Sequence, residues 1–138
     1  MRASVLLVTF APLVVFTGIF IALARPPWPA YRWLGLVLSV IGLVLLTIAR
    51  INLGDSFSIT PQAQALVTSG IYSKIRHPVY VFSAIAIAGL LLYIQMPWLC
   101  LLLIPIATLQ VRRARAEERV LTEKFGEAYV KYKKETWF

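Results

Sequence analysis

The apolar residues of this chain are gathered into four long blocks that no charged side chain interrupts. The blocks cover residues 4–24, 33–49, 79–95 and 98–111. Because a helix needs about 20 apolar residues to cross a bilayer, the first block of 21 is long enough and the next two, of 17 each, are at the short end. The fourth, of 14, forms either a strongly tilted span or one arm of a tight hairpin with the third. The pattern predicts an all-α integral membrane bundle of about four transmembrane helices.

A second pattern begins after the fourth block. Apolar residues, with one glutamate among them, recur there at spacings of three and four, which predicts one face of an amphipathic helix. The positions are Val111, Ala114, Glu118, Leu121 and Phe125. We expect Gly126 to end this helix and residues 127–134 to form a shorter basic one. Glu118 lies on the apolar side, and because burying an unpaired carboxylate is costly, it needs a cationic partner.

Composition separates the chain from ordinary soluble proteins. Hydrophobic residues make up 59% of it and charged residues 14%, with a mean hydropathy of +0.77. Its length predicts one domain over residues 1–138. A cleaved signal peptide is the alternative for the N-terminus, because Arg2 and the small-residue stretch at 22–24 flank the first block. The block is too long for that interpretation, so we expect a retained span.

The basic residues predict the orientation in the membrane. Four spans place the N-terminus, residues 50–76 and the C-terminal tail on one side, which then carries 12 of the 14 lysines and arginines; only Arg25 and Arg32 lie on the other. By the positive-inside rule we expect both termini in the cytoplasm, at the inner membrane if the cell is prokaryotic. Anionic lipid headgroups explain the net charge of +8, so we expect membrane lipids as partners and no nucleic acid.

Residue types exclude several chemistries. A single cysteine, Cys100, and a single histidine, His77, argue against an intrachain disulfide and against a metal site. The scattered glycines form no nucleotide-binding motif, and no charged side chain lies in a span, which argues against an ion pump. Chemistry is therefore expected at the cytoplasmic interface, with a substrate that arrives from the bilayer.

Proline and small residues predict local features of the bundle. We expect Pro97 to open the fourth helix and Pro105 to kink it. Small residues four apart allow helices to approach closely; the pairs are Gly18/Ala22, Gly35/Ser39 and Ala84/Ala88. A short strand-like stretch covers residues 57–60.

The stretch around the single histidine combines several features of a ligand site. Because proline is favoured at the first position of a helix, Pro78 is expected there, with His77 as the N-cap and Tyr80 about one turn on. A helix N-terminus suits an anion, and Arg76 adds a positive charge. The alternative is that Arg76 and His77 are anchors at the membrane interface.

Two segments together resemble the isoprenylcysteine carboxyl methyltransferase and phospholipid methyltransferase family, in the correct order and spacing over the C-terminal half. The family pattern is Leu-Val-x-x-Gly-x-Tyr, then Arg-His-Pro-x-Tyr, two membrane segments, and Arg…Glu-Glu-x-x-Leu-x-x-x-Phe-Gly-x-x-Tyr-x-x-Tyr. The matching residues are Leu66, Val67, Gly70, Tyr72, Arg76, His77, Pro78, Tyr80, Arg113, Glu117, Glu118, Leu121, Phe125, Gly126, Tyr129 and Tyr132.

The resemblance implies a membrane enzyme that uses S-adenosylmethionine without a dinucleotide-binding domain. It implies cofactor segments at 64–80 and 112–134; the implied cofactor residues are Gln64, Ala65, Leu66, Val67, Tyr72, Arg76, His77, Pro78, Val79, Tyr80, Glu117 and Glu118. Glu117 is expected to contact the cofactor ammonium and Arg113 the substrate, and both are the catalytic candidates. The motif favours Glu117 for the cofactor, whereas periodicity alone favours Glu118.

The chain departs from the family pattern at three places. Phe82 stands where the family usually has glycine and is expected to narrow the pocket, Gln64 replaces a histidine frequent in eukaryotic members, and the chain ends at Phe138 before the longer tail of larger relatives.

The acceptor and two other functions stay open. An isoprenylcysteine-like carboxylate, a lipid amine and a lipophilic thiol all suit a pocket that opens to lipid. The first alternative function is an NADPH-dependent reductase of the sterol-reductase type, whose related segment typically reads Arg-His-Pro-Asn-Tyr where this chain has Val79. The second is a non-catalytic four-helix membrane module.

Overall fold

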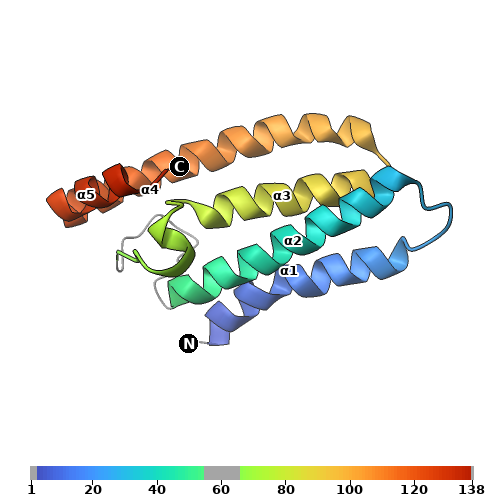
Figure 1. The fold of residues 1–138 in the computed structure, drawn as a ribbon, viewed down its shortest axis with the longest axis horizontal. Coiled ribbons are helices and arrows are strands. Elements are labelled where there is room, and N and C mark those ends of the chain that lie inside the picture. Colours follow the sequence, from blue (N-terminus) through green and yellow to red (C-terminus); the bar gives the residue numbers. More distant parts are fainter. Residues whose placement is uncertain (1–2, 55–65, 138) are drawn as a thin grey trace.

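The computed structural model describes residues 3–54 and 66–137. Within these ranges the chain is all-helical, as predicted, and its only β-type pairing is an isolated bridge between Ile75 and Trp137. The α-helices are α1 (Ala3–Ala22), α2 (Ala30–Leu53), α3 (Pro78–Tyr93), α4 (Leu103–Phe125) and α5 (Glu127–Glu135), with 3₁₀ helices η2 (Gly70–Ser73) and η3 (Pro97–Leu102) (Figure 1). The strand expected at 57–60 lies outside the described residues.

The C-terminal half differs from the prediction in its boundaries. The fourth apolar block begins as the 3₁₀ helix η3, which Pro97 opens, and α4 then runs without a break from Leu103 to Phe125. The predicted last span and the predicted amphipathic helix are therefore parts of one helix. Pro105 is the third residue of α4, where the backbone nitrogen has no intrahelical partner to lose, so the reason for the expected kink is removed. Gly126 ends α4 with φ +50°, as expected.

Two of the helices are long and apolar enough to cross a membrane, namely α1 and α2. Only 11% of the apolar window of α1 and 33% of that of α2 are buried, whereas the core helix of a soluble protein is mostly buried. Large apolar side chains such as Leu7, Val14 and Ile21 are each more than two-thirds exposed. Exposed apolar surface of this extent is consistent with a membrane protein. α3, with 16 residues, is a shorter apolar helix.

Helices α2 and α3 pack at very short range because small residues face each other. A Cβ atom on Gly89 would lie 2.4 Å from the backbone nitrogen of Ser39, and one on Gly35 would lie 2.6 Å from the carbonyl oxygen of Gly89. The Ser39 hydroxyl donates a hydrogen bond to the carbonyl of Ala86 at 2.8 Å, across the same contact. The prediction of close packing at Gly35 and Ser39 is confirmed.

The other two predicted small-residue contacts are wrong. A Cβ atom on Gly18 would meet nothing within 4 Å, so α1 makes no close approach there. On α3 the buried small residues are Ala86 and Gly89, and Ala84 and Ala88 are only half-buried. Small residues do lie in the contact of α3 with α2, but they are Ala86 and Gly89 instead of the predicted Ala84 and Ala88.

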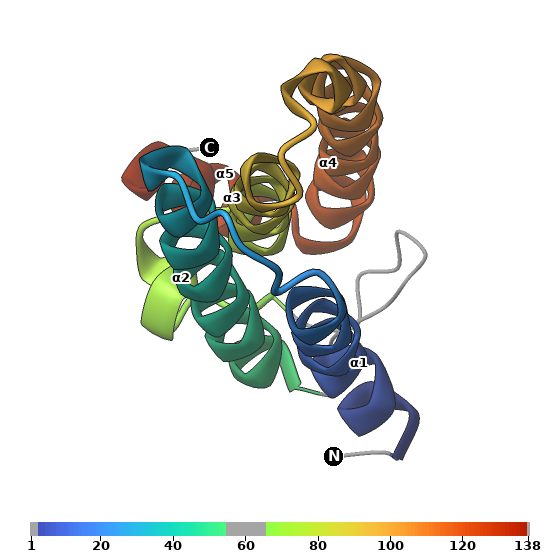
Figure 2. The same ribbon diagram turned by 90° about the vertical axis from the view of Figure 1, so that its right-hand side faces the viewer.

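The bundle has two distinct ends. The start of α1, η2, the start of α3 and α5 gather at one end, and the connections 23–29 and 94–102 lie at the other (Figures 1 and 2). At that second end, the buried Arg32 donates hydrogen bonds to the carbonyls of Leu23, Arg25 and Pro27. Its guanidinium also lies 4.6 Å from the ring centre of Tyr93. Arg32 thus satisfies carbonyls at and just beyond the end of α1, which a helix leaves without partners.

Candidate active site

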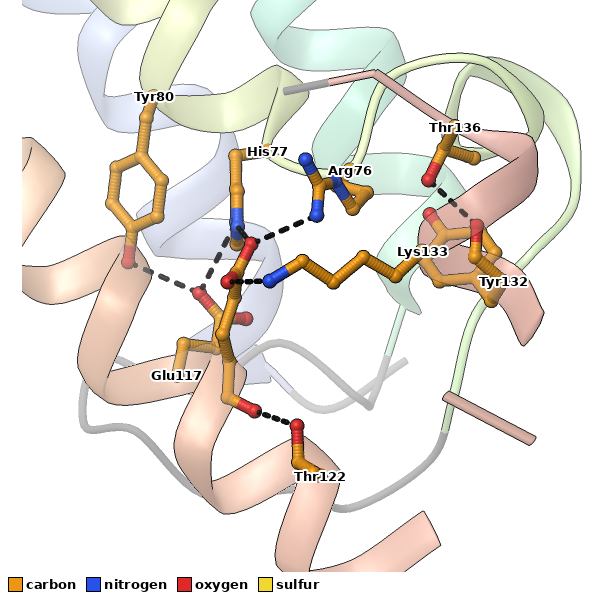
Figure 3. Close-up of polar contacts among 9 residues, drawn as sticks. Arg76, His77, Tyr80, Glu117, Thr122, Tyr132, Lys133 and Thr136 are labelled. Carbon is orange, nitrogen blue, oxygen red and sulfur yellow. Dashed lines mark hydrogen bonds and ion pairs between the residues drawn. The ribbon is translucent and has the colours of Figure 1, made fainter. Parts of the chain in front are cut away.

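The first residues of α3 are arranged as predicted. His77 is the N-cap and Pro78 the first helical residue. The imidazole of His77 makes no capping hydrogen bond; it is buried and turned toward α4 (Figure 3). The histidine therefore connects the start of α3 to the two adjacent glutamates of α4.

Both carboxylate oxygens of Glu118 contact nitrogen atoms of basic side chains. Oε1 lies 3.2 Å from Nη1 of Arg76 and 3.3 Å from Nε2 of His77, and Oε2 lies 2.8 Å from Nζ of Lys133 (Figure 3). Burial raises the pKa of Glu118, but the hydrogen bonds from Lys133 and His77 and the charges of Lys133 and Arg76 together lower it below its ordinary value. The expectation that Glu118 needs a cationic partner is confirmed.

Glu117 is in a different environment, although it is the next residue. The Tyr80 hydroxyl donates to its Oε2 at 3.3 Å, and Nδ1 of His77 lies 3.9 Å from the same oxygen. Its side chain is 38% exposed, against 22% for Glu118. Within residues 3–54 and 66–137, no group hydrogen-bonds Oε1 of Glu117. Of the two carboxylates, Glu117 is the one with an oxygen left to accept a hydrogen bond from a ligand.

Three further tyrosines lie near enough to these carboxylates for the carboxylate charges to act on their hydroxyls. Tyr72, in η2, is buried, and that burial, followed by the charge of Glu117, raises the pKa of its hydroxyl. Burial also raises the pKa of Tyr129, with Glu118 as the next cause, and raises that of Tyr132 to about 12. The hydroxyls therefore stay protonated at physiological pH, and that of Tyr132 donates a hydrogen bond. Tyr129 is fully buried, and its hydroxyl has no hydrogen-bond partner among the described residues.

The C-terminal segment closes over the loop that leads into α3. The Tyr132 hydroxyl donates to the carbonyl of Tyr72 at 2.6 Å. Beyond α5, the amide of Trp137 donates to the carbonyl of Lys74 at 3.1 Å, and the amide of Arg76 donates to the carbonyl of Trp137 at 3.4 Å. Sequence reasoning missed this contact. The buried side chains Tyr129, Tyr132 and Thr136 are spaced by three and four, and this spacing was the available signal.

Other predicted cofactor residues lie near this cluster without joining it. Leu66 and Val67 are half-buried just before η2, and Val67 and Val79 pack against the core formed by α2, η2 and α3. Pro78 is fully buried. Gln64 and Ala65 lie outside the described residues.

Arg113 and Phe82 lie on different sides of the site. Arg113 is exposed on α4, close enough to Tyr80 for its charge to act on that hydroxyl, and it makes no ion pair with Glu117 in the described part of the chain. Phe82 is buried in the core with Leu46 and Tyr72. The phenyl ring thus fills the contact between α3 and α2 instead of narrowing a pocket between α3 and α4.

Comparison with known proteins finds a match to the segments that form this site. A sequence model of the phospholipid methyltransferase family matches residues 30–128, which include Arg76, His77, Tyr80 and both glutamates. The chain belongs to this family. It is also 34% identical over 119 residues to the protein-S-isoprenylcysteine O-methyltransferase of Xenopus laevis. The match covers 79% of the chain and 41% of that relative, so the chain spans about two fifths of the relative's length.

Membership of the family has two consequences for the site. The predicted family is confirmed, and the residues that carried the resemblance from Leu66 to Gly126 lie within residues 30–128 of the family model. The family is one of membrane methyltransferases, which favours methyl transfer over the reductase interpretation of Arg76-His77-Pro78. Tyr129 and Tyr132, which also carried the resemblance, and Lys133 lie beyond the range of the family model.

Proposed function

We propose that this protein transfers a methyl group from S-adenosylmethionine to a lipophilic acceptor at the cytoplasmic face of a membrane. The observation that carries the proposal is the pair of adjacent glutamates. Glu118 is saturated by Arg76, His77 and Lys133, and Glu117 keeps one carboxylate oxygen for a ligand. A partly exposed carboxylate beside tyrosine hydroxyls is suited to an ammonium group, and S-adenosylmethionine carries one.

The residues around Glu117 fit that ligand. The Tyr80 hydroxyl donates to the Glu117 carboxylate from the side of α3, next to the His77 ring, so the carboxylate is oriented before the ligand arrives. When bound, S-adenosylmethionine supplies a methyl group on a sulfonium that is already activated for transfer, so the protein need not provide an acid. The main tasks of the chain are then to position the reactants and to exclude water.

Arg113 is the proposed contact for the acceptor. Its exposed guanidinium on α4 lies near Tyr80, one helical turn before Glu117. A guanidinium suits a carboxylate through paired hydrogen bonds, and a carboxylate acceptor needs no base. The relative from Xenopus laevis is named for O-methylation of an S-isoprenylcysteine, which supports an isoprenylcysteine-like carboxylate over a lipid amine or thiol.

We also propose that α1, α2, α3 and the first half of α4 cross the membrane, with both termini in the cytoplasm. The arrangement that supports this places the N-terminus and α5 at the same end of the bundle as the site (Figure 1). The cytoplasmic assignment follows from the 12 basic residues expected on that side.

The proposal is tested with the purified protein in detergent. Thermal unfolding is followed with S-adenosylmethionine, its demethylated product and NADPH, and radiolabelled methyl transfer is then measured to an S-farnesylcysteine carboxylate, to phosphatidylethanolamine and to a long-chain thiol. We expect stabilisation by the first two compounds and transfer to the farnesylcysteine. Stabilisation by NADPH alone would favour the reductase, and stabilisation by none of the three would favour a non-catalytic module.

A further inference from the structure

α5 carries three exposed lysines, and one of them reaches into the site. Nζ of Lys133 lies 2.8 Å from Oε2 of Glu118, 15 positions earlier in the sequence. Lys131 and Lys134 make no ion pair with any described residue. Lys133 also lies beyond residues 30–128, the range that the family match covers. The contact therefore belongs to the C-terminal segment of this chain, which folds back on α4 after Gly126.

The Lys133 contact means that two segments bind Glu118. Arg76 and His77 share Oε1 and come from the loop before α3, whereas Lys133 takes Oε2 and comes from α5. A charge-assisted hydrogen bond to the second oxygen fixes how the carboxylate plane is turned. Without it, Glu118 is held only through Oε1, so rotation about its terminal torsion is less restrained and the direction of Oε1 is less well fixed.

The orientation of Glu118 matters because it holds His77. The imidazole lies between the two glutamates, with Nε2 at 3.3 Å from Glu118 and Nδ1 at 3.9 Å from Glu117. In a neutral imidazole one nitrogen donates and the other accepts, so the partner of Nε2 decides what Nδ1 presents to Glu117. Lys133 thus orients Glu118, Glu118 orients the His77 ring, and the ring faces Glu117, the carboxylate proposed to bind the ligand.

We propose that Lys133 is a positioning residue of the ligand site: by binding Oε2 of Glu118 it fixes the His77 ring against Glu117. The expected effect of Lys133 on S-adenosylmethionine binding rests on the proposed function. The expected effect of Lys133 on the His77 ring does not, so the two effects can be tested separately.

The first arm of the test uses the single histidine of the chain. Protein labelled with ¹⁵N only in histidine gives the ring nitrogen signals of His77 without assignment. We expect Lys133→Met to change the ring ¹⁵N chemical shifts, Lys133→Arg to restore them, and Lys134→Met to leave them as in the wild type. Lys134→Met is the matched control because it removes the same charge from the adjacent exposed position. Equal effects of both methionine variants, or no effect of Lys133→Met, would overturn the proposal.

The second arm measures the affinity for S-adenosylmethionine by calorimetry in detergent. Because Lys133 is half exposed, we expect Lys133→Met to weaken binding by about threefold to fivefold, with recovery in Lys133→Arg and no change in Lys134→Met. A changed histidine signal with unchanged affinity would overturn the link from Lys133 to the ligand. A changed histidine signal in a wild-type protein that binds no S-adenosylmethionine would refute the proposed function and leave the positioning of His77 supported.

Discussion

Replacing Tyr132 with phenylalanine tests how α5 is held on the loop before α3. The substitution removes one buried hydroxyl and the 2.6 Å hydrogen bond that it donates to the carbonyl of Tyr72. A typical hydrogen bond contributes about 0.5–1.5 kcal/mol net, and a buried acceptor left without its donor raises the cost to about 1–3 kcal/mol. The ring remains, so the packing of α5 is unchanged. We therefore expect Tyr132→Phe to lower the free energy of unfolding by about 1–3 kcal/mol.

The chain provides a matched control for this substitution at Tyr129. The control removes the same atom from the same helix, one turn earlier, at a buried hydroxyl without a hydrogen-bond partner among residues 3–54 and 66–137. We expect Tyr129→Phe to leave stability unchanged or to raise it by up to about 1 kcal/mol, since an unsatisfied polar group is removed.

The assay is equilibrium unfolding of the ligand-free protein in detergent, followed by circular dichroism. Exchange of the Trp137 amide, which bonds to the carbonyl of Lys74, reports on the same closure of the C-terminal segment. We expect faster exchange in Tyr132→Phe and unchanged exchange in Tyr129→Phe. Equal losses of stability in the two variants, or a larger loss in Tyr129→Phe, would refute the docking of α5 described above.

Two further predictions concern helix packing and pH. Gly89→Ala places a Cβ atom 2.4 Å from the backbone of Ser39 and is expected to lower stability by about 1–3 kcal/mol, whereas Gly18→Ala, with nothing within 4 Å, should have no such effect in the same unfolding assay. Glu118 has a lowered pKa, so its carboxylate adds stability that is fully present above the ordinary glutamate pKa and is lost as the pH falls through the lowered value. The stability difference between wild type and Glu118→Gln should accordingly be full at pH 7 and vanish well below about pH 4, and a difference that persists there would contradict the ion pairs of Glu118.

Local sequence signals were enough to predict most of the helices and the start of α3. Uninterrupted apolar blocks predict long apolar helices, and Pro78 predicts where α3 begins. The fourth block and the amphipathic stretch were predicted as separate helices because the residues change from apolar to charged near Val111, but a change in polarity does not by itself end a helix. No glycine or proline stands between Ile106 and Phe125, so nothing interrupts α4 there.

Contacts between distant segments were harder to predict. The apolar seam indicated that Glu118 needs a cation, but Lys133 becomes its partner only because the chain reverses at Gly126. The backbone pairing of Trp137 with Lys74 and Arg76 depends on the same reversal, and the spacing of the buried residues of α5 indicates only that this helix packs against something, without naming its partner. The different environments of Glu117 and Glu118 follow from this arrangement, so a motif that names both residues does not distinguish them.

The most direct test of the account is the affinity of S-adenosylmethionine for Glu117→Gln, measured by calorimetry in detergent. A hydrogen bond to a charged group contributes about 1.5–3 kcal/mol, so removing the charge should weaken binding by at least about tenfold. Glu123→Gln is the control, because it removes a carboxylate from an exposed position of the same helix that makes no ion pair in the described ranges. The account predicts a large loss for Glu117→Gln and wild-type affinity for Glu123→Gln. Wild-type affinity in Glu117→Gln would contradict the central claim that Glu117 is the ligand carboxylate.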